Sequence, residues 1–104
     1  MDFWRVKRKE TRVLLAIPVV IEGVDLDNQP FIEETTTDNV SKLGACIVVN
    51  QDLKLGSFIS LTAFQGKFSC KAEVKAVWLD ESEKKKKKKI GVRFVEPPVN
   101  WVVS

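Results

Sequence analysis

The stretch Phe-Ser-Cys-Lys-Ala-Glu-Val-Lys-Ala-Val-Trp, residues 68–78, decides the fold class of this chain. Apolar residues occupy every second position from Phe68 to Trp78, and the residues between them include Ser69, Lys71, Glu73 and Lys75. Successive side chains of a β-strand point to opposite faces of the sheet. This period of two therefore predicts a strand with one buried face.

Five further segments carry β-strand signals, and turn sequences separate them. The predicted strands are residues 13–22, 31–37, 45–50, 58–64 and 90–95, and the turns lie at 25–28, 43–44, 55–56 and 65–67. Six short strands at this spacing predict a barrel or a sandwich. No segment before residue 96 shows apolar residues at helical spacing with a capping residue, so we expect no long helix. Pro18 cannot donate to a strand ladder, and we place it at an edge or a bulge.

The length and the apolar runs indicate one domain without a membrane span. A chain of 104 residues without internal repeats can bury a single core. The longest apolar stretch, residues 13–21, has nine residues and contains a proline, whereas a membrane-spanning helix needs about 20. No small-residue cleavage site follows this stretch, so we do not interpret it as a signal peptide and expect a cytoplasmic protein.

The net charge is +3, but the chain outside one lysine run is mildly acidic. Six of the 17 basic residues form the run Lys84–Lys89, and without it 11 basic residues face 14 acidic ones. We expect this run to form the solvated tip of a hairpin between the fifth and sixth strands. The alternative is contact with nucleic acid or anionic lipid. We do not expect nucleic acid, because no aromatic residue stands beside the lysines for base stacking.

The chain contains no histidine, which removes the commonest general base and metal ligand. We expect no enzyme activity, no catalytic residue, no metal site and no cofactor. Cys46 and Cys70 each stand among apolar residues and are interpreted as free core thiols, although a disulfide remains open if their strands are neighbours. We also expect the aromatic residues of the predicted strands in the core, namely Phe31, Phe58, Phe68, Phe94 and Trp78.

Two polar motifs flank the first predicted hairpin. Arg8 and Arg12 form an Arg-x-x-x-Arg pair before it, and residues 39–44 read Asn-Val-Ser-Lys-Leu-Gly after it. Two arginine forks four residues apart can grip one compact anion, and Gly44 can adopt a positive φ that turns the chain. The alternatives are an arginine pair that is merely solvated and an ordinary Asx or Ser turn bonded to its own backbone.

In this order, either side of the first hairpin of an all-β chain, the two motifs resemble the PilZ family of small β-barrels that bind cyclic di-GMP. The resemblance continues through residues 45–48, 55–56, 76–78 and 91–98. It implies a six-stranded antiparallel β-barrel and a ligand site made of Arg8, Arg12, Asn39, Ser41 and Gly44. The Asn39 amide would pair with a guanine edge, and the Ser41 hydroxyl would bond to the ligand or the local backbone. The arginines would engage phosphate or guanine.

We therefore expect a basic, mobile N-terminal arm over residues 1–12, a PilZ-like barrel over 13–96 and a C-terminal tail over 97–104. The expected function is that of a bacterial effector in second-messenger signalling, whose arm becomes ordered when cyclic di-GMP binds and whose new surface a downstream protein reads. One rival is a protein-interaction adaptor of the same fold without nucleotide binding. The other is a small nucleic-acid-binding barrel that uses the lysine run and the arm.

Overall fold

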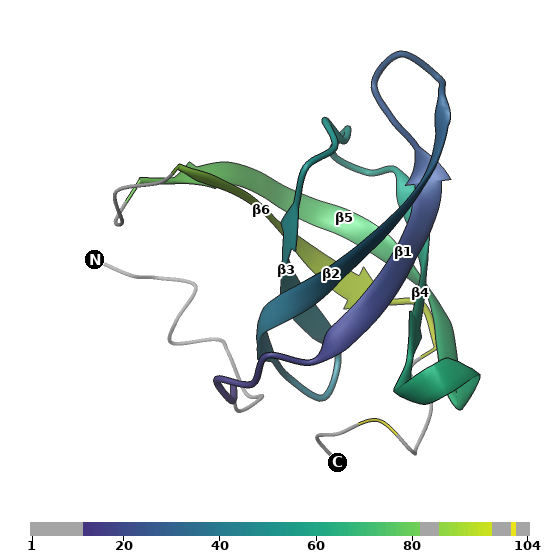
Figure 1. Ribbon diagram of the computed structural model, residues 1–104, viewed down its shortest axis with the longest axis vertical. Helices are drawn as coiled ribbons and strands as arrows, with labels where there is room; N and C mark the ends of the chain where they lie inside the picture. Colours follow the sequence, from purple (N-terminus) through teal and green to yellow (C-terminus); the bar gives the residue numbers. More distant parts are fainter. Residues whose placement is uncertain (1–11, 82–85, 97–100, 102–104) are drawn as a thin grey trace.

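Six antiparallel strands form a closed β-barrel in the computed structural model, which describes residues 12–81, 86–96 and 101 (Figure 1). The strands are β1 (Pro18–Val24), β2 (Pro30–Val40), β3 (Gly44–Val49), β4 (Phe58–Ala63), β5 (Phe68–Asp80) and β6 (Lys87–Phe94), with a short 3-10 turn, η1 (Phe64–Gly66). Their order around the barrel is β1-β2-β3-β6-β5-β4. The predicted six-stranded antiparallel barrel is confirmed. Of the predicted arm, all but Arg12 lies outside the described residues.

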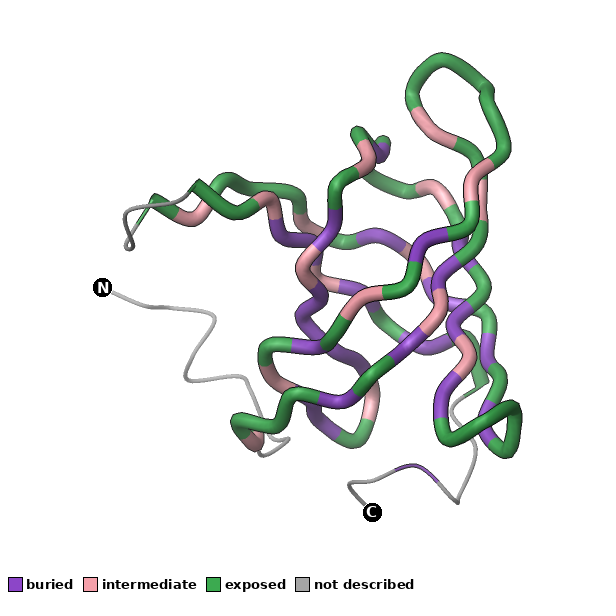
Figure 2. The backbone as a smooth tube through the Cα atoms, viewed as in Figure 1, coloured by how far each residue is buried: buried purple, intermediate pink, exposed green. Residues whose placement is uncertain are grey.

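The barrel interior holds the apolar faces that the alternating pattern predicted. Buried positions recur along the strands in Figure 2, and β5 contributes one from every second residue up to Val74. Closure of the sheet follows from the pairing of β1 with β4 and of β3 with β6. The most deeply buried side chains include Phe68, Ile21, Ile47, Leu61, Ile90, Val40 and Val74. Cys46 and Cys70 are buried free thiols, as expected.

Two β-bulges interrupt the regular register. One lies in β2 between Thr37 and Asn39, opposite β3, and the other in β5 between Val74 and Ala76, opposite β6. A bulge adds one unpaired residue and reverses which face the following side chains occupy. The prediction that Trp78 lies in the core is therefore wrong: after the bulge its side chain is on the outer face and 41% exposed.

The lysine run is not a solvated hairpin tip as a whole, and that prediction is wrong for its second half. Lys87, Lys88 and Lys89 belong to β6, which with β5 forms a ribbon extending beyond the barrel (Figure 1). Lys88 forms an ion pair with Asp52, and Lys89 is buried. Residues 82–85, which include the start of the run, lie outside the described residues.

The first strand begins later than predicted, at Pro18 instead of Val13. Proline lacks the N–H of a ladder and is accepted at the first residue of a strand. Before it, the Thr37 hydroxyl donates to the Leu15 carbonyl and accepts from the Ile17 N–H. This side chain replaces part of the ladder. The backbone of the segment from Val13 onward is joined to β2 by a bridge between Val13 and Val40 and by the Thr37 N–H, which donates to the Ile17 carbonyl.

Aromatic packing differs from the prediction at two further positions. Phe58 is 48% exposed, with the Lys71 ammonium 4.5 Å from its ring centroid. Trp101, which we placed in the tail, is 4% exposed and packs between Phe68 and Phe94, with ring centroids 4.3 and 5.0 Å away. The chain after β6 therefore contributes to the core, and the indole N–H of Trp101 donates to the Ser41 carbonyl at 2.8 Å.

Candidate ligand-binding site

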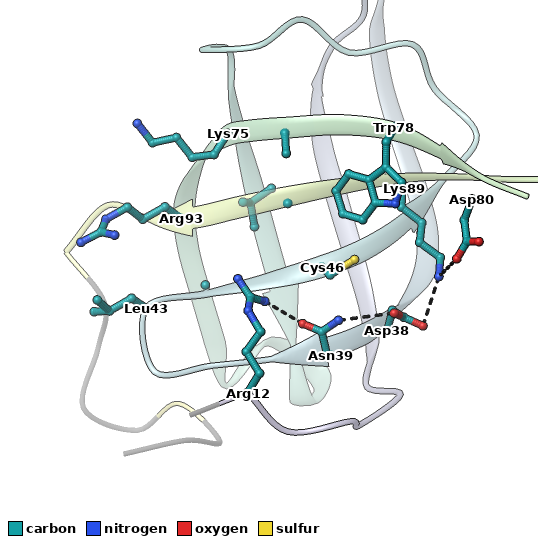
Figure 3. Close-up of a pocket in the computed structure, with 14 residues that line it drawn as sticks. Arg12, Asp38, Asn39, Leu43, Cys46, Lys75, Trp78, Asp80, Lys89 and Arg93 are labelled. Atoms are coloured by element: carbon teal, nitrogen blue, oxygen red, sulfur yellow. Dashed lines mark hydrogen bonds and ion pairs between the residues drawn. The ribbon is translucent and has the colours of Figure 1, made fainter. Parts of the chain in front are cut away.

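A cavity of about 790 Å³ lies against the outer face of the barrel where β2, β3, β6 and β5 run side by side (Figure 3). Its lining includes four basic side chains, two carboxylates, one tryptophan and one thiol. The basic residues are Arg12, Lys75, Lys89 and Arg93, and the carboxylates are Asp38 and Asp80. A mixed polar and apolar concavity of this size suits a small organic anion.

The two bulges build the walls of this cavity. Asp38 is the extra residue of the β2 bulge, and Lys75 is the extra residue of the β5 bulge. Without a bulge, Asp38 and Asn39 would point to opposite faces, yet both line the cavity. The β5 bulge likewise moves Trp78 to the outer face, above Gly91 of β6. Bulges are common beside functional sites because they re-aim side chains in this way.

Arg12 and Asn39, 27 residues apart in sequence, meet at the edge of the cavity (Figure 3). The Arg12 guanidinium donates from Nη1 to Asn39 Oδ1 at 2.6 Å. The Asn39 amide nitrogen in turn donates to Asp38 Oδ2 at 3.3 Å. The structure thus brings together one residue from each predicted motif. Arg8 lies outside the described residues.

Lys89 links the two carboxylates of the cavity. Its ammonium lies 2.6 Å from Asp80 Oδ2 and 3.4 Å from Asp38 Oδ1. The hydrogen bond to Asp80 raises the pKa of Lys89 above its ordinary value, with a further contribution from Asp38. The lysine is therefore charged throughout the physiological range, and it offsets the negative charge on this side of the cavity.

The turn between β2 and β3 places Ser41 and Gly44 differently from what the motif suggested. Ser41 is fully buried, and its hydroxyl donates to the Gly44 carbonyl at 3.4 Å. A direct contact of this hydroxyl with a ligand would require the turn to open. The prediction of a positive φ at Gly44 is wrong, because Gly56 and Gly66 are the described glycines in that conformation. Gly44 is instead needed for space, since a Cβ there would lie 2.1 Å from the Val92 carbonyl oxygen.

The sequence interpretation missed most residues of the cavity lining, among them one tryptophan and three basic residues. Trp78 was placed in the core, and Lys89 was placed in a solvated tip. Lys75 and Arg93 were given no role, yet both line the cavity from β5 and β6. The polar position of Lys75 on the outer face of a predicted strand was a usable signal. For Trp78 and Lys89 the deciding features are the bulge and the two carboxylates from other strands, which no local pattern displays.

Cys46 lies in the wall of the cavity and is 4% exposed. Burial, reinforced by the Asp38 carboxylate, raises the pKa of the Cys46 thiol to about 11. Since the thiolate is the reactive form, we expect alkylation at pH 8 to be about a hundredfold slower in the folded Cys70→Ser variant than in the same variant unfolded.

The rate of this alkylation should continue to rise with pH up to about 11. The neutral thiol stabilises the fold fully below the pKa of an unfolded thiol, so this contribution is lost as the pH rises toward 11. Mass spectrometry of iodoacetamide-treated protein across pH 7–11 measures the rate. A rate that levels off near pH 8.5 would contradict a buried, protonated Cys46.

Two other kinds of site are absent from the described ranges. Residues 12–81, 86–96 and 101 contain no group of three or more Cys, Asp or Glu side chains placed to hold a metal ion. They also contain no helix that is long and apolar enough to cross a bilayer.

Comparison with known proteins agrees with this architecture. A model of the PilZ domain matches residues 6–100. The Bacillus subtilis inhibitor of motility MotI superposes with a TM-score of 0.69 at 18% identity, covering 88% of this chain and 44% of that one. The PilZ domain of Escherichia coli YcgR with c-di-GMP gives 0.65 at 16% identity, covering 89% and 81%.

The MrkH–c-di-GMP complex of K. pneumonia gives a TM-score of 0.65 at 14% identity and covers 85% of this chain and 44% of that one. The chain therefore spans less than half the length of MotI and MrkH. At these identities the similarity shows a shared fold. No curated protein matches the chain.

Proposed function

The chain belongs to the PilZ domain family, and on this premise we propose that it is a binding module for cyclic di-GMP. The ligand would occupy the cavity between Arg12 and Asn39 on one side and Trp78 and Arg93 on the other. Cyclic di-GMP carries two phosphodiesters and two guanines, so its recognition needs both cations and groups that pair with base edges. PilZ domains are binding and effector modules, and we assign no catalytic residue.

The contact between Arg12 and Asn39 is the observation that carries this proposal. Arg12 and Asn39 are 27 residues apart in sequence, and two unrelated motifs would not be expected to contact each other. Their side chains are nevertheless hydrogen-bonded at the edge of the cavity. A guanidinium fork matches the O6 and N7 acceptors of guanine or a pair of phosphate oxygens. The Asn39 amide offers a donor and an acceptor to a base edge.

The charge and the aromatic wall of the cavity support an anionic, planar ligand. Arg12, Lys75 and Arg93 supply positive charge around the opening. Lys89 offsets one of the two negative charges of Asp38 and Asp80, which lowers their repulsion of a phosphate. Trp78 is 41% exposed and lines the cavity, where its ring can stack on a purine. Ser41 and Gly44 would act by shaping the turn that presents Asn39.

The rival function of a nucleic-acid-binding barrel draws no support from the lysine run. Of its described members, Lys86 pairs with Glu81, Lys88 with Asp52, and Lys89 with Asp80 and Asp38. These ion pairs reduce the charge available for phosphate backbones. The described residues give no support to the adaptor without nucleotide binding, because the cavity is present and Arg12 contacts Asn39 at its edge.

Calorimetric titration with cyclic di-GMP, GMP and single-stranded oligonucleotides tests the proposed function. We expect saturable binding of cyclic di-GMP, at least tenfold weaker binding of GMP, which carries half the recognition groups, and no specific binding of oligonucleotides. Comparable affinity for oligonucleotides, falling steeply with salt, would favour the nucleic-acid barrel. No binding of any nucleotide would favour the adaptor.

We further propose that ligand binding orders the arm and that a downstream protein reads the resulting surface. Support comes from the position of Arg12, which already ties the start of the described chain to β2. Fixing each further residue of the arm costs about 1–2 kcal/mol of backbone entropy, so the ligand must supply that energy. Slower tryptic cleavage between Arg5 and Arg12 on addition of cyclic di-GMP would support this step.

A further inference from the structure

The last lysine of the run occupies a setting unlike that of its neighbours. The Lys89 side chain is 11% exposed, whereas that of Lys86 is 68% exposed. Lys89 lies between carboxylates of two different strands, Asp80 of β5 and Asp38 of β2. Placing an ammonium where water is largely excluded is costly unless opposite charges surround it. Two carboxylates at 2.6 and 3.4 Å meet that condition.

Removal of this cation would leave two carboxylates facing the same cavity. The side chains of Asp38 and Asp80 are 42% and 27% exposed, so solvent would screen only part of their negative charge. Both Asp38 and Asp80 line the cavity in which we place an anion. Lys89 therefore offsets one of the two negative charges on this wall of the cavity and lowers its repulsion of phosphate.

A row of polar contacts connects Lys89 to the proposed recognition group (Figure 3). Lys89 contacts Asp38 Oδ1, Asp38 Oδ2 accepts from the Asn39 amide nitrogen, and Asn39 Oδ1 accepts from Arg12. A guanidinium only donates and a carboxylate only accepts. The two neighbours of Asn39 therefore fix which end of its amide carries the oxygen. Asp38 can orient the nitrogen end of the Asn39 amide only while Lys89 fixes the position of the Asp38 carboxylate.

We propose that Lys89 is a positioning residue for nucleotide recognition, an inference that rests on the proposed function. It holds Asp38, and through Asp38 it fixes the orientation of the Asn39 amide. It also offsets one of the two negative charges of the carboxylate wall. The part of its effect on affinity that acts through Asn39 depends on the presence of that amide.

The first test needs no ligand. The side-chain amide of Asn39 is followed by NMR in 15N-labelled wild-type protein, Lys89→Gln and the matched control Lys86→Gln. We expect two resolved amide proton signals for Asn39 in wild type and Lys86→Gln. In Lys89→Gln they should exchange with water at least fivefold faster. Unchanged exchange in folded Lys89→Gln overturns the proposal.

The second test measures cyclic di-GMP affinity in a double-mutant cycle. Lys89→Gln should weaken binding at least fivefold in the wild-type background and by a smaller factor in the Asn39→Ala background, where only the change in charge remains. Lys89→Arg should restore at least half of the loss, because a guanidinium can also bridge two carboxylates. Equal losses in both backgrounds would overturn action through Asn39.

Two outcomes need separate interpretation. If wild-type protein does not bind cyclic di-GMP, the proposed function fails, and the Asn39 amide signals still decide whether Lys89 positions that side chain. If Lys89→Gln does not fold, Asp38→Asn replaces it, because that variant weakens the same connection and leaves the contact of Lys89 with Asp80. Wild-type amide exchange in Asp38→Asn would then overturn the proposal.

Discussion

Replacing Gly44 with alanine should lower the free energy of unfolding by at least about 3 kcal/mol, near the upper end of what overpacking usually costs. A Cβ at Gly44 would lie 2.1 Å from the carbonyl oxygen of Val92 and 3.2 Å from its carbonyl carbon. Both contacts are with the backbone of β6, which cannot rotate away as a side chain does. The strands β3 and β6 would have to separate where their pairing closes the barrel.

Gly91→Ala is the matched control, because Gly91 lies on β6 and pairs with Cys46 of β3. Its added Cβ would meet Ala76 and Trp78 side-chain atoms at 3.6 and 3.7 Å, which is ordinary contact. We expect its stability to change by less than about 1 kcal/mol. Urea unfolding followed by tryptophan fluorescence measures both variants. Equal midpoints for the two alanine variants would show that the close approach at Gly44 is not what the position requires.

The fold was readable from the sequence because its strands follow local rules. The alternation from residue 68 onward, the apolar segments and the turn sequences together specify six strands, and the structure has six. Strand pairs joined by short turns are antiparallel, so closure into a barrel needs only the two pairings β1 with β4 and β3 with β6. These two pairings join strands that are not consecutive in the chain, so the strand pattern alone left a barrel and a sandwich open, and the family resemblance implied the barrel.

The site was only partly readable, because it depends on two single-residue bulges. Period-two reasoning assigns Trp78 to the buried face of β5, and it is correct up to Val74. The extra residue Lys75 then reverses which face of β5 the following side chains occupy. The local composition gives no sign of this bulge. The bulge in β2 likewise places Asp38 and Asn39 on the same face, where both line the cavity. The sequence motif identified Asn39 as a site residue but did not indicate the role of Asp38.

The lysine run misled for a different reason. A run of like charges is usually solvated, and Lys86 follows that rule. Lys89 departs from it because two carboxylates reach it, Asp80 from nine residues away on the paired strand β5 and Asp38 from the distant strand β2. Only the barrel topology brings these three residues together. A buried charge of this kind is therefore visible in the structure and not in the composition.

Replacing Arg12 with alanine should weaken cyclic di-GMP binding at least tenfold, because a charge-assisted fork is worth about 1.5–3 kcal/mol. The fold should be little affected, since the bond between Arg12 and Asn39 is exposed. Lys67→Ala is the matched control: it removes one positive charge from an exposed position of the barrel that is not part of the cavity lining. We expect it to retain wild-type affinity.

Arg12→Lys separates charge from geometry at the same position. Lysine keeps the positive charge but offers a single ammonium in place of the planar fork, so it cannot pair with two acceptors of one guanine or phosphate at once. If recognition depends on the fork, Arg12→Lys should lose at least fivefold in calorimetric titration and should discriminate less between cyclic di-GMP and GMP. Arg8 lies outside the described residues, and we expect Arg8→Ala, like Arg12→Ala, to weaken binding at least tenfold. Wild-type affinity in the Arg8→Ala, Arg12→Ala double variant would remove the ligand assignment, whereas wild-type affinity in Arg12→Lys alone would show that the cavity needs only positive charge at its edge.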